Sequence, residues 1–225
     1  MKYISVAVDG PAGAGKSSVS KAVAKSLGYT YIDTGAMYRA VALFAINNGI
    51  DAKNETEKLV SHLNEVEIDI KYTDDGQQIY LLGENVSKRI REEDVSVGAS
   101  NVAVIPEVRK KLVELQRKMA ESANVIMDGR DICSYVLPNA DVKIFLTASA
   151  ESRAKRRYDE LCEKGIECDF KKIKADMEYR DKNDSQRAVA PLKKADDATL
   201  IDTTEYDFDG AVKLVKDLIL EKTEG

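Results

Sequence analysis

Residues 6–18 read VAVDGPAGAGKSS and join a short apolar run to a glycine-rich loop and to the start of an expected helix. Within them, Gly10 to Ser17 fit the pattern G-x-x-x-x-G-K-[ST], whose glycines let successive backbone N–H groups turn toward a phosphate. Lys16 is expected to reach the β and γ phosphates of a nucleotide, and the Ser17 hydroxyl to ligate Mg²⁺. A glycine-rich turn without a ligand is the alternative, which the full eight-residue match between strand and helix disfavours. The stretch therefore predicts a bound triphosphate.

Apolar runs alternate with helical patterns along most of the chain. The runs expected to be strands are residues 3–8, 29–32, 124–127, 143–148 and 199–203. Residues 17–27 and the stretch from Ala211 to Ile219 carry apolar side chains at helical spacing. This alternation predicts an α/β fold of three layers, with a parallel five-stranded sheet between helices.

Two segments break the alternation. Residues 65–87 contain two strand-like runs around an Asp-Gly turn, with a possible third strand, which predicts a small antiparallel insertion. Residues 150–187 form an expected helical hairpin hinged near Gly165, with eleven Lys/Arg and ten Asp/Glu. Such a charged pair of helices suits a mobile cover better than a core.

Composition narrows the class of protein. The 225 residues are 44% hydrophobic and 32% charged, which is typical of an ordinary globular protein. The net charge of −5 and the mixing of acids with bases argue against nucleic acid as a partner. Three cysteines and one histidine indicate neither a disulfide framework nor a zinc site. No membrane-length apolar run or signal peptide is evident, so we expect a cytoplasmic protein without membrane contact, and a monomer.

The positions of the arginines indicate which kind of molecule accepts the phosphoryl group. Arg39 and Arg130 each follow an expected strand, at the sheet edge where ligands of doubly wound folds bind. An acceptor that is itself a phosphate needs an arginine clamp rather than a general base. A lone arginine is usually a surface ion-pair partner, but two at one edge favour a second phosphate site.

The charged hairpin adds further arginines. Arg153, Arg156 and Arg157 are spaced to share one helix face, and Arg180 and Arg187 flank the return. A solvated face is the alternative to a set of arginine fingers that fold over the phosphates. The candidate catalytic residues are thus Lys16, Arg130, Arg153, Arg157, Arg180 and Arg187.

Asp128 closes the apolar run NVIM, where phosphate-loop enzymes often keep an acid that orients Mg²⁺ through water. A structural aspartate that caps a turn is the alternative.

The motifs GPAGAGKSS, DTGAMYR, VIMDGRDI and YRDKNDSQRAVAPL together resemble the bacterial cytidylate kinases of the nucleoside monophosphate kinase group. The resemblance runs from Val6 to about residue 203. It implies a P-loop NTPase fold that moves the γ-phosphoryl group of ATP, with Mg²⁺, to CMP or dCMP. It also implies an ATP-binding core of residues 1–37, 98–149 and 188–225, a monophosphate-binding domain of residues 38–97, and a lid of residues 150–187.

The resemblance also assigns roles to residues. Arg39 and Arg130 would hold the CMP phosphate, and Ser100, Arg109 and Asp131 would read the cytosine edge. The full CMP set is Thr34, Arg39, Ser100, Arg109, Asp128, Arg130, Asp131, Arg180, Asp184 and Arg187. The ATP set is Gly10, Pro11, Ala12, Gly13, Ala14, Gly15, Lys16, Ser17, Ser18 and Arg156. Thr34 stands where many members have Ser, and its hydroxyl is kept.

Base chemistry agrees with CMP as the acceptor. Cytosine presents an N4 amino donor, which the Asp131 carboxylate can accept, whereas uracil presents a carbonyl oxygen there. That mismatch would leave a buried polar group unpaired, so we expect CMP to be preferred over UMP, with the deoxy sugar tolerated.

Other activities stay open as alternatives. One is a kinase of the same architecture for UMP, AMP or a hydroxylated metabolite. Another is a GTP-hydrolysing switch, which would need an N/T-K-x-D motif that is absent and a D-x-x-G motif that Asp128 to Asp131 do not fit. A nucleic-acid-binding module is the weakest, given the charge balance.

Overall fold

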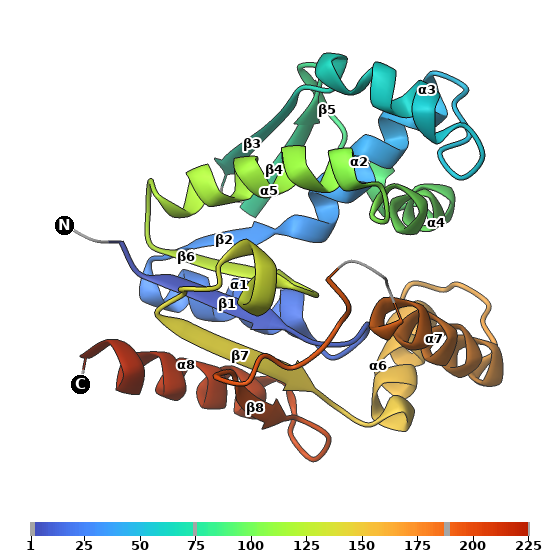
Figure 1. Ribbon diagram of the computed structural model, residues 1–225. Coiled ribbons are helices and arrows are strands. Elements are labelled where there is room, and N and C mark those ends of the chain that lie inside the picture. The colour runs from blue at the N-terminus through green and yellow to red at the C-terminus, as the bar shows by residue number, and fades with distance from the viewer. Residues whose placement is uncertain (1–2, 74–75, 187–189, 225) are drawn as a thin grey trace. The chain divides into compact units, whose positions relative to one another are not determined.

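The computed structural model describes residues 3–73, 76–186 and 190–224 (Figure 1). The chain divides into two compact units, one formed by Met1–Tyr31 with Ala120–Gly225 and the other by Ile32–Met119. Each unit has its own hydrophobic cluster.

A five-stranded sheet underlies the first unit, in the order β2-β6-β1-β7-β8. β1 pairs in parallel with β6 on one side and with β7 on the other, and β7 pairs in parallel with β8. The predicted α/β fold with a parallel five-stranded sheet is therefore confirmed. The strands are β1 (Ser5–Asp9), β2 (Thr30–Asp33), β6 (Val125–Gly129), β7 (Val142–Thr147) and β8 (Thr199–Asp202).

The strand order makes the end of β1 a natural ligand site. After β1 the chain continues to β2, at one edge of the sheet. The connections from β6 to β7 and from β7 to β8 run toward the opposite edge. In open α/β sheets, ligands bind beyond the carboxyl ends of strands where the connections diverge in this way. The glycine-rich loop begins at that point.

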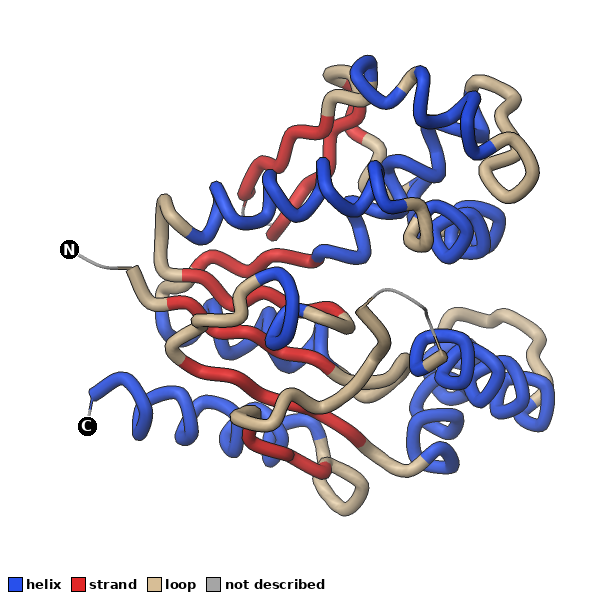
Figure 2. Tube along the Cα trace, in the orientation of Figure 1, coloured by secondary structure: helices blue, strands red, loops and turns tan. Residues whose placement is uncertain are grey.

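Helices complete the first unit (Figure 2). α1 and α8 pack against each other and against the strands, where Val19, Val23, Val215 and Ile219 are buried with the apolar side chains of β1 and β7. α6 and α7 pack together as the predicted helical hairpin. The helical elements are α1 (Lys16–Leu27), the single π-helical turn η3 (Ile132–Val136), α6 (Ala150–Glu163), α7 (Phe170–Ser185) and α8 (Phe208–Glu224).

The second unit surrounds α2 (Thr34–Asn47), whose apolar side chains are almost all buried. Gly98 of α4 allows close packing, because a Cβ there would lie 3.1 Å from the Cβ of Ala42. A small sheet in the order β3-β4-β5 is antiparallel throughout, which confirms the predicted insertion and its third strand. The remaining elements are α3 (Thr56–Ser61), η1 (Leu63–Glu65), β3 (Ile68–Thr73), β4 (Gly76–Leu81), β5 (Glu84–Asn85), η2 (Arg89–Arg91), α4 (Glu93–Val102) and α5 (Pro106–Ala120).

The compact units differ from the three-domain division expected above. Residues 98–119 group with the second unit rather than with the core, because Val102, Val108 and Leu112 belong to the hydrophobic cluster around α2. The hairpin of α6 and α7 groups with the first unit. The functional division into core, monophosphate-binding domain and lid stays a prediction.

None of the helices in residues 3–73, 76–186 and 190–224 is both long enough and apolar enough to cross a membrane.

Candidate active site

The glycine-rich loop lies between β1 and α1, as predicted. Gly10 is required by close packing, since a Cβ there would lie 1.9 Å from the carbonyl oxygen of Leu146 in β7. Gly15 precedes α1 with a φ of 84°, a left-handed conformation that other residues rarely adopt. The loop is thus anchored at its start and turned sharply at its end, which presents the N-terminus of α1 to a ligand.

The side chain of Lys16 folds back over the glycine loop. Its Nζ donates a hydrogen bond of 2.8 Å to the carbonyl oxygen of Pro11, and its side chain is buried. Burial first, and then the positive charge of Arg130, lower the pKa of Lys16 to about 7, while Asp128, Asp9 and Asp184 act in the opposite direction. Two cations therefore influence each other at the end of β1, which is the electrostatic setting of an anion site.

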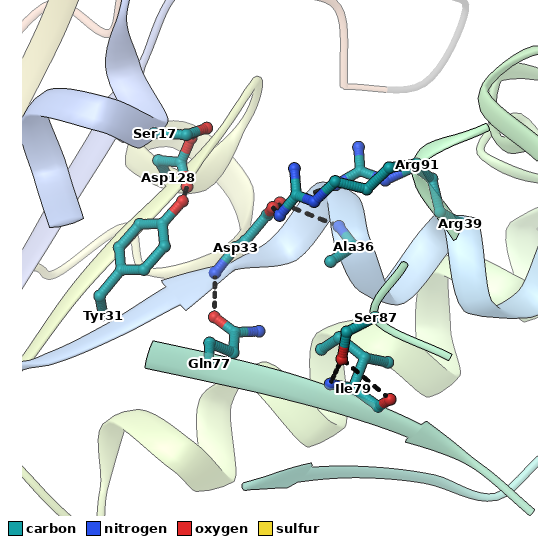
Figure 3. A network of polar contacts seen from close by, with 10 residues as sticks. All are labelled: Ser17, Tyr31, Asp33, Ala36, Arg39, Gln77, Ile79, Ser87, Arg91 and Asp128. Atoms are coloured by element: carbon teal, nitrogen blue, oxygen red, sulfur yellow. Dashed lines mark hydrogen bonds and ion pairs between the residues drawn. The ribbon is translucent and has the colours of Figure 1, made fainter. Parts of the chain in front are cut away.

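Asp128 receives two hydroxyl donors (Figure 3). Ser17 Oγ donates to its Oδ2 at 2.8 Å, and Tyr31 Oη donates to its Oδ1 at 2.8 Å. The residue is only 4% exposed, so these hydrogen bonds fix the orientation of its carboxylate. Sequence reasoning missed Tyr31; its place in the strand beside β6 is a signal only once the strand order is known.

Asp9, the last residue of β1, was also missed. Its Oδ1 and Oδ2 accept hydrogen bonds of 2.8 Å from the backbone N–H groups of Ile132 and Cys133. The carboxylate is fully buried, and desolvation raises its pKa in spite of these two donors. An acid that closes an apolar strand directly before the glycine loop is the sequence signal that could have found it. Asp9 holds the loop after β6 beside the loop after β1.

The loop after β6 carries Arg130 and Asp131, and the structure brings Arg130 together with Asp184. Arg130 Nε donates to Asp184 Oδ2 at 2.9 Å, and its Nη1 donates to the carbonyl oxygen of Gly129. Asp184 lies near the end of α7 and is buried. Two residues predicted for the acceptor are therefore in direct contact, and Asp131, which follows Arg130 in the sequence, is also buried.

The arginines of α6 have different environments, although their spacing predicts a shared face. Arg153 is 5% exposed and donates to the carbonyl oxygens of Ala148 and Ala12, the second of these in the glycine loop. Its Nη2 also pairs with Asp181 of α7 at 2.6 Å. Only this arginine of the three has a partner in the glycine loop among the contacts of the described residues.

Arg156 and Arg157 have hydrogen-bond partners outside the glycine loop, although Arg156 Nη1 would lie 3.9 Å from a Cβ added at Gly15. Arg156 donates to the Thr203 hydroxyl and to the carbonyl oxygens of Thr203 and Tyr206, beyond the end of β8. Arg157 pairs with the exposed Glu160 one turn along the helix, which agrees with the alternative of a solvated face. Arg180 lies in α7 but its side chain is not described, and Arg187 lies outside the described residues.

The second unit holds a separate polar cluster at the start of α2 (Figure 3). Asp33 caps the helix by accepting from the Ala36 N–H, and its Oδ2 pairs with Arg39 at 3.0 Å and with Arg91 at 3.5 Å. Gln77 of β4 accepts from the Asp33 N–H. Arg39 Nε and Gln77 Nε2 are buried donors without an acceptor in the described part of the chain, which suits an anionic or polar ligand. Arg91 and Gln77 have no sequence motif that marks them.

The remaining candidates for the acceptor base and phosphate lie in both units. Thr34 begins α2 and is buried, Ser100 is exposed on α4, and Arg109 of α5 is 3% exposed with a 3.5 Å hydrogen bond to the Ala103 carbonyl oxygen. These three belong to the second unit, and Asp131 belongs to the first.

The comparisons with known proteins decide the family. A family model described as cytidylate kinase matches residues 6–221. The chain belongs to the cytidylate kinase family.

Curated relatives support this membership over the full length. A cytidylate kinase of Anoxybacillus flavithermus is 49% identical, with 100% of this chain and 99% of that protein covered. A cytidylate kinase of Caldicellulosiruptor saccharolyticus is 50% identical, with coverages of 97% and 96%. Among solved structures, an uncharacterised protein from Eubacterium ventriosum is 17% identical with a TM-score of 0.52, over 98% of this chain and 99% of that one; it shows likeness of fold alone.

Oxygen ligands suitable for Mg²⁺ are present in this cytidylate kinase family member. The Ser17 hydroxyl and the Asp128 carboxylate are adjacent, and hydroxyl, carboxylate, water and phosphate oxygens are the ligands that Mg²⁺ prefers. Across the described ranges, no group of three or more His, Cys, Asp or Glu side chains could bind a metal by itself. The Ser17 and Asp128 oxygens therefore fit Mg²⁺ that is also bound by water and phosphate oxygens.

Proposed function

We propose that this chain transfers the γ-phosphoryl group of ATP to CMP or dCMP, giving ADP and CDP or dCDP. The observation that carries the proposal is the cluster at the end of β1, where Lys16 and Arg130 are near enough for the charge of Arg130 to lower the pKa of Lys16. Lys16 is buried and Arg130 is partly exposed, and two cations held this close are favourable when a phosphate group lies between them. A donor phosphate at Lys16 and an acceptor phosphate at Arg130 satisfy this requirement.

The donor half uses the glycine loop. Backbone N–H groups of residues 10–18 cradle the phosphates of ATP, and Lys16 exchanges its hydrogen bond to Pro11 for a phosphate oxygen. Because a polyphosphate favours the charged form, Lys16 takes up a proton when ATP binds. Ser17 directly, and Asp128 through water, would hold Mg²⁺, which neutralises charge on the phosphates when it is bound. Arg156 is the proposed contact to ATP from α6.

The acceptor half uses arginines in place of a base, because the attacking phosphate oxygen is already ionised. Arg39 and Arg130 hold the acceptor phosphate, with Thr34 as a hydroxyl donor. Ser100, Arg109 and Asp131 read the cytosine edge. Arg180, Asp184 and Arg187 serve the sugar and the phosphates.

The hairpin of α6 and α7 acts as a cover that excludes water. Arg153 joins it to the glycine loop through Ala12, and Met177 packs against Gly13, where an added Cβ would lie 2.8 Å from the methionine methyl group. Exclusion of water protects the phosphoryl group from hydrolysis. We further propose that the protein works as a monomer in the cytoplasm.

A panel of acceptors tests the proposal. ADP release with Mg·ATP is measured over CMP, dCMP, UMP, AMP and GMP, and CMP and dCMP are expected to give the highest kcat/KM. A higher value for UMP or AMP would assign the chain to a different acceptor and overturn the proposal.

A variant pair tests the base reader. Asp131→Asn keeps the size of the side chain but offers an N–H donor to uracil O4, so the CMP to UMP ratio of kcat/KM is expected to fall by at least about tenfold. Asp159→Ala, an exposed position on α6, is the control and is expected to leave the ratio unchanged. An unaltered ratio in Asp131→Asn would remove Asp131 from base recognition.

A further inference from the structure

Two of the three cysteines lie side by side at the turn of the α6–α7 hairpin. Cys162 Sγ and Cys168 Sγ are 3.9 Å apart, and both residues are free thiols. A disulfide bond is about 2.05 Å long, so a shift of roughly 2 Å, shared between two side chains, would join them. Cys162 is exposed and Cys168 is partly exposed, so a reagent can reach the pair.

The turn itself positions the two thiols. Gly165 has a φ of 69°, its N–H donates to the carbonyl oxygen of Cys162, and the Ile166 N–H donates to that of Leu161. These are the two hydrogen bonds of a Schellman motif, which ends α6 and reverses the chain. Cys168, three residues after the glycine, therefore returns beside the last turn of α6.

Contacts on the rest of the hairpin keep the two helices in register. The rings of Tyr158 and Phe170 meet edge to face with centroids 6.0 Å apart, one turn before Cys162 and two residues after Cys168. Farther along, Glu151 pairs with Lys174. The proximity of the thiols therefore follows from the packing of the whole hairpin.

Cys133 provides an internal contrast. It is 1% exposed, and its Sγ contacts the carbonyl oxygens of Ala7 and Ile144 within the sheet. Burial raises the pKa of this thiol far above its ordinary value, and the thiolate is the reactive form. Cys133 is thus expected to be inert while the chain is folded.

We propose that Cys162 and Cys168 form a reversible dithiol–disulfide site that is oxidised by low-molecular-weight disulfides. The more exposed Cys162 loses its proton to water and attacks one sulfur of the reagent, which forms a mixed disulfide and releases one thiolate. Cys168, likewise deprotonated, then attacks the Cys162 sulfur, closes the internal disulfide and releases the second thiolate. The two cysteines lose two electrons and two protons, and the reagent becomes two thiols.

The site is of the labile kind. An exposed disulfide that spans a short turn is more easily reduced than a buried structural one, so ordinary dithiols are expected to reverse it. The cross-link joins Cys162, in the last turn of α6, to Cys168, which precedes Asp169, the N-cap of α7. Arg153 lies at the opposite end of α6. The cross-link would fix the turn of the hairpin while leaving the contact of Arg153 with the glycine loop in place. This inference does not depend on the proposed substrate.

Oxidised glutathione, added to the folded full-length chain, is the probe. Intact mass is expected to fall by two hydrogen atoms, and only one thiol is expected to remain, which reacts after unfolding. Trypsin cuts after Lys164, so the peptides 158–164 and 165–171 should stay joined until a reductant is added, while peptide 131–143 with Cys133 stays separate.

Serine variants assign the steps. Cys168→Ser is expected to stop at the glutathione adduct on Cys162, Cys162→Ser to form no internal disulfide, and Cys133→Ser to behave as the natural chain. Three unreacted thiols under conditions that oxidise a simple dithiol, a bond between two chains, or a cross-link to Cys133 would each overturn the proposal.

Discussion

The glycine loop and the charged hairpin, both in the first unit, are rich in polar residues but hold them in opposite ways. In the loop region, contacts join residues far apart in sequence: Ser17 bonds Asp128, and Asp9 bonds the Ile132 N–H, across separations of 111 and 123 residues. In the hairpin, most ion pairs join exposed side chains one turn apart, such as Arg157 with Glu160. Exposed pairs of this kind contribute about 0 to 1 kcal/mol to stability.

Burial and distant partners indicate where a polar side chain can have a function. A polar side chain held by distant, buried partners has a fixed direction, whereas an exposed pair on one helix can exchange its partner for water at little cost. Arg153 and Asp184 are exceptions in the hairpin, because both are buried and have distant partners: Arg153 reaches Ala12 and Asp181, and Asp184 pairs with Arg130. Substitutions at buried and at exposed positions test this contrast.

Lys16→Ala removes the buried cation of the loop. We expect kcat with Mg·ATP and CMP to fall by about 1,000-fold or more, because charge stabilisation at the transferred phosphoryl group is lost. The assay is ADP release, and circular dichroism through a thermal melt checks that the variant is folded. A folded variant with near-normal turnover would contradict the role of the loop.

Arg153→Ala and Arg157→Ala compare two arginines of one helix. Arg153→Ala leaves Asp181 without its cation and frees the hairpin from Ala12, so kcat/KM is expected to fall by about 100-fold. Arg157→Ala removes only an exposed pair and is expected to stay within about twofold. Equal losses in the two variants would remove the distinction between buried and exposed arginines.

Tyr31→Phe tests the orientation of Asp128. Loss of a hydrogen bond to a charged group costs about 1.5 to 3 kcal/mol, so the apparent KM for Mg²⁺ is expected to rise by about tenfold, with a smaller change in kcat. Tyr29→Phe is the matched control, because Tyr29 packs against the hydrophobic cluster that includes α1 and α8 instead. If both variants changed the Mg²⁺ dependence alike, Tyr31 would have no special part in it.

Proton uptake tests the state of Lys16. Because the pKa of Lys16 is about 7, its side chain is mostly neutral at pH 8 in the enzyme without nucleotide. A bound polyphosphate favours the charged form of the side chain. ATP binding at pH 8 is therefore expected to take up a fraction of one proton, seen by calorimetry in buffers of different ionisation enthalpy. The arginine of Lys16→Arg is always charged, so this variant should not take up the proton. Protons exchanged by ATP itself are the same for both proteins and cancel in the comparison. Equal uptake in the two proteins would show that Lys16 does not titrate.

The sequence allowed the fold and the loop to be predicted because their signals are local. Glycine spacing, alternating apolar runs and the Asp-Gly turn each act within a few residues, and the strands and small sheet follow them. The hydrogen-bond partners of Tyr31 and Asp9 could not be assigned in this way, because they are fixed by strand order across more than 90 residues. The spacing of the α6 arginines predicted one face, but burial and the position of α7 gave each arginine a different partner.

Asp9 has a consequence for the order in which the chain acquires its structure. When synthesis has completed the glycine loop, the two amides that Asp9 binds are still 123 and 124 residues away. Contacts of such long sequence separation form late, because the entropy of closing the intervening chain opposes them. A nascent chain that stops before residue 132 therefore carries the complete phosphate-binding motif without the amides that hold its preceding carboxylate. We expect its nucleotide affinity to mature only after β6 and the turn that follows have left the ribosome.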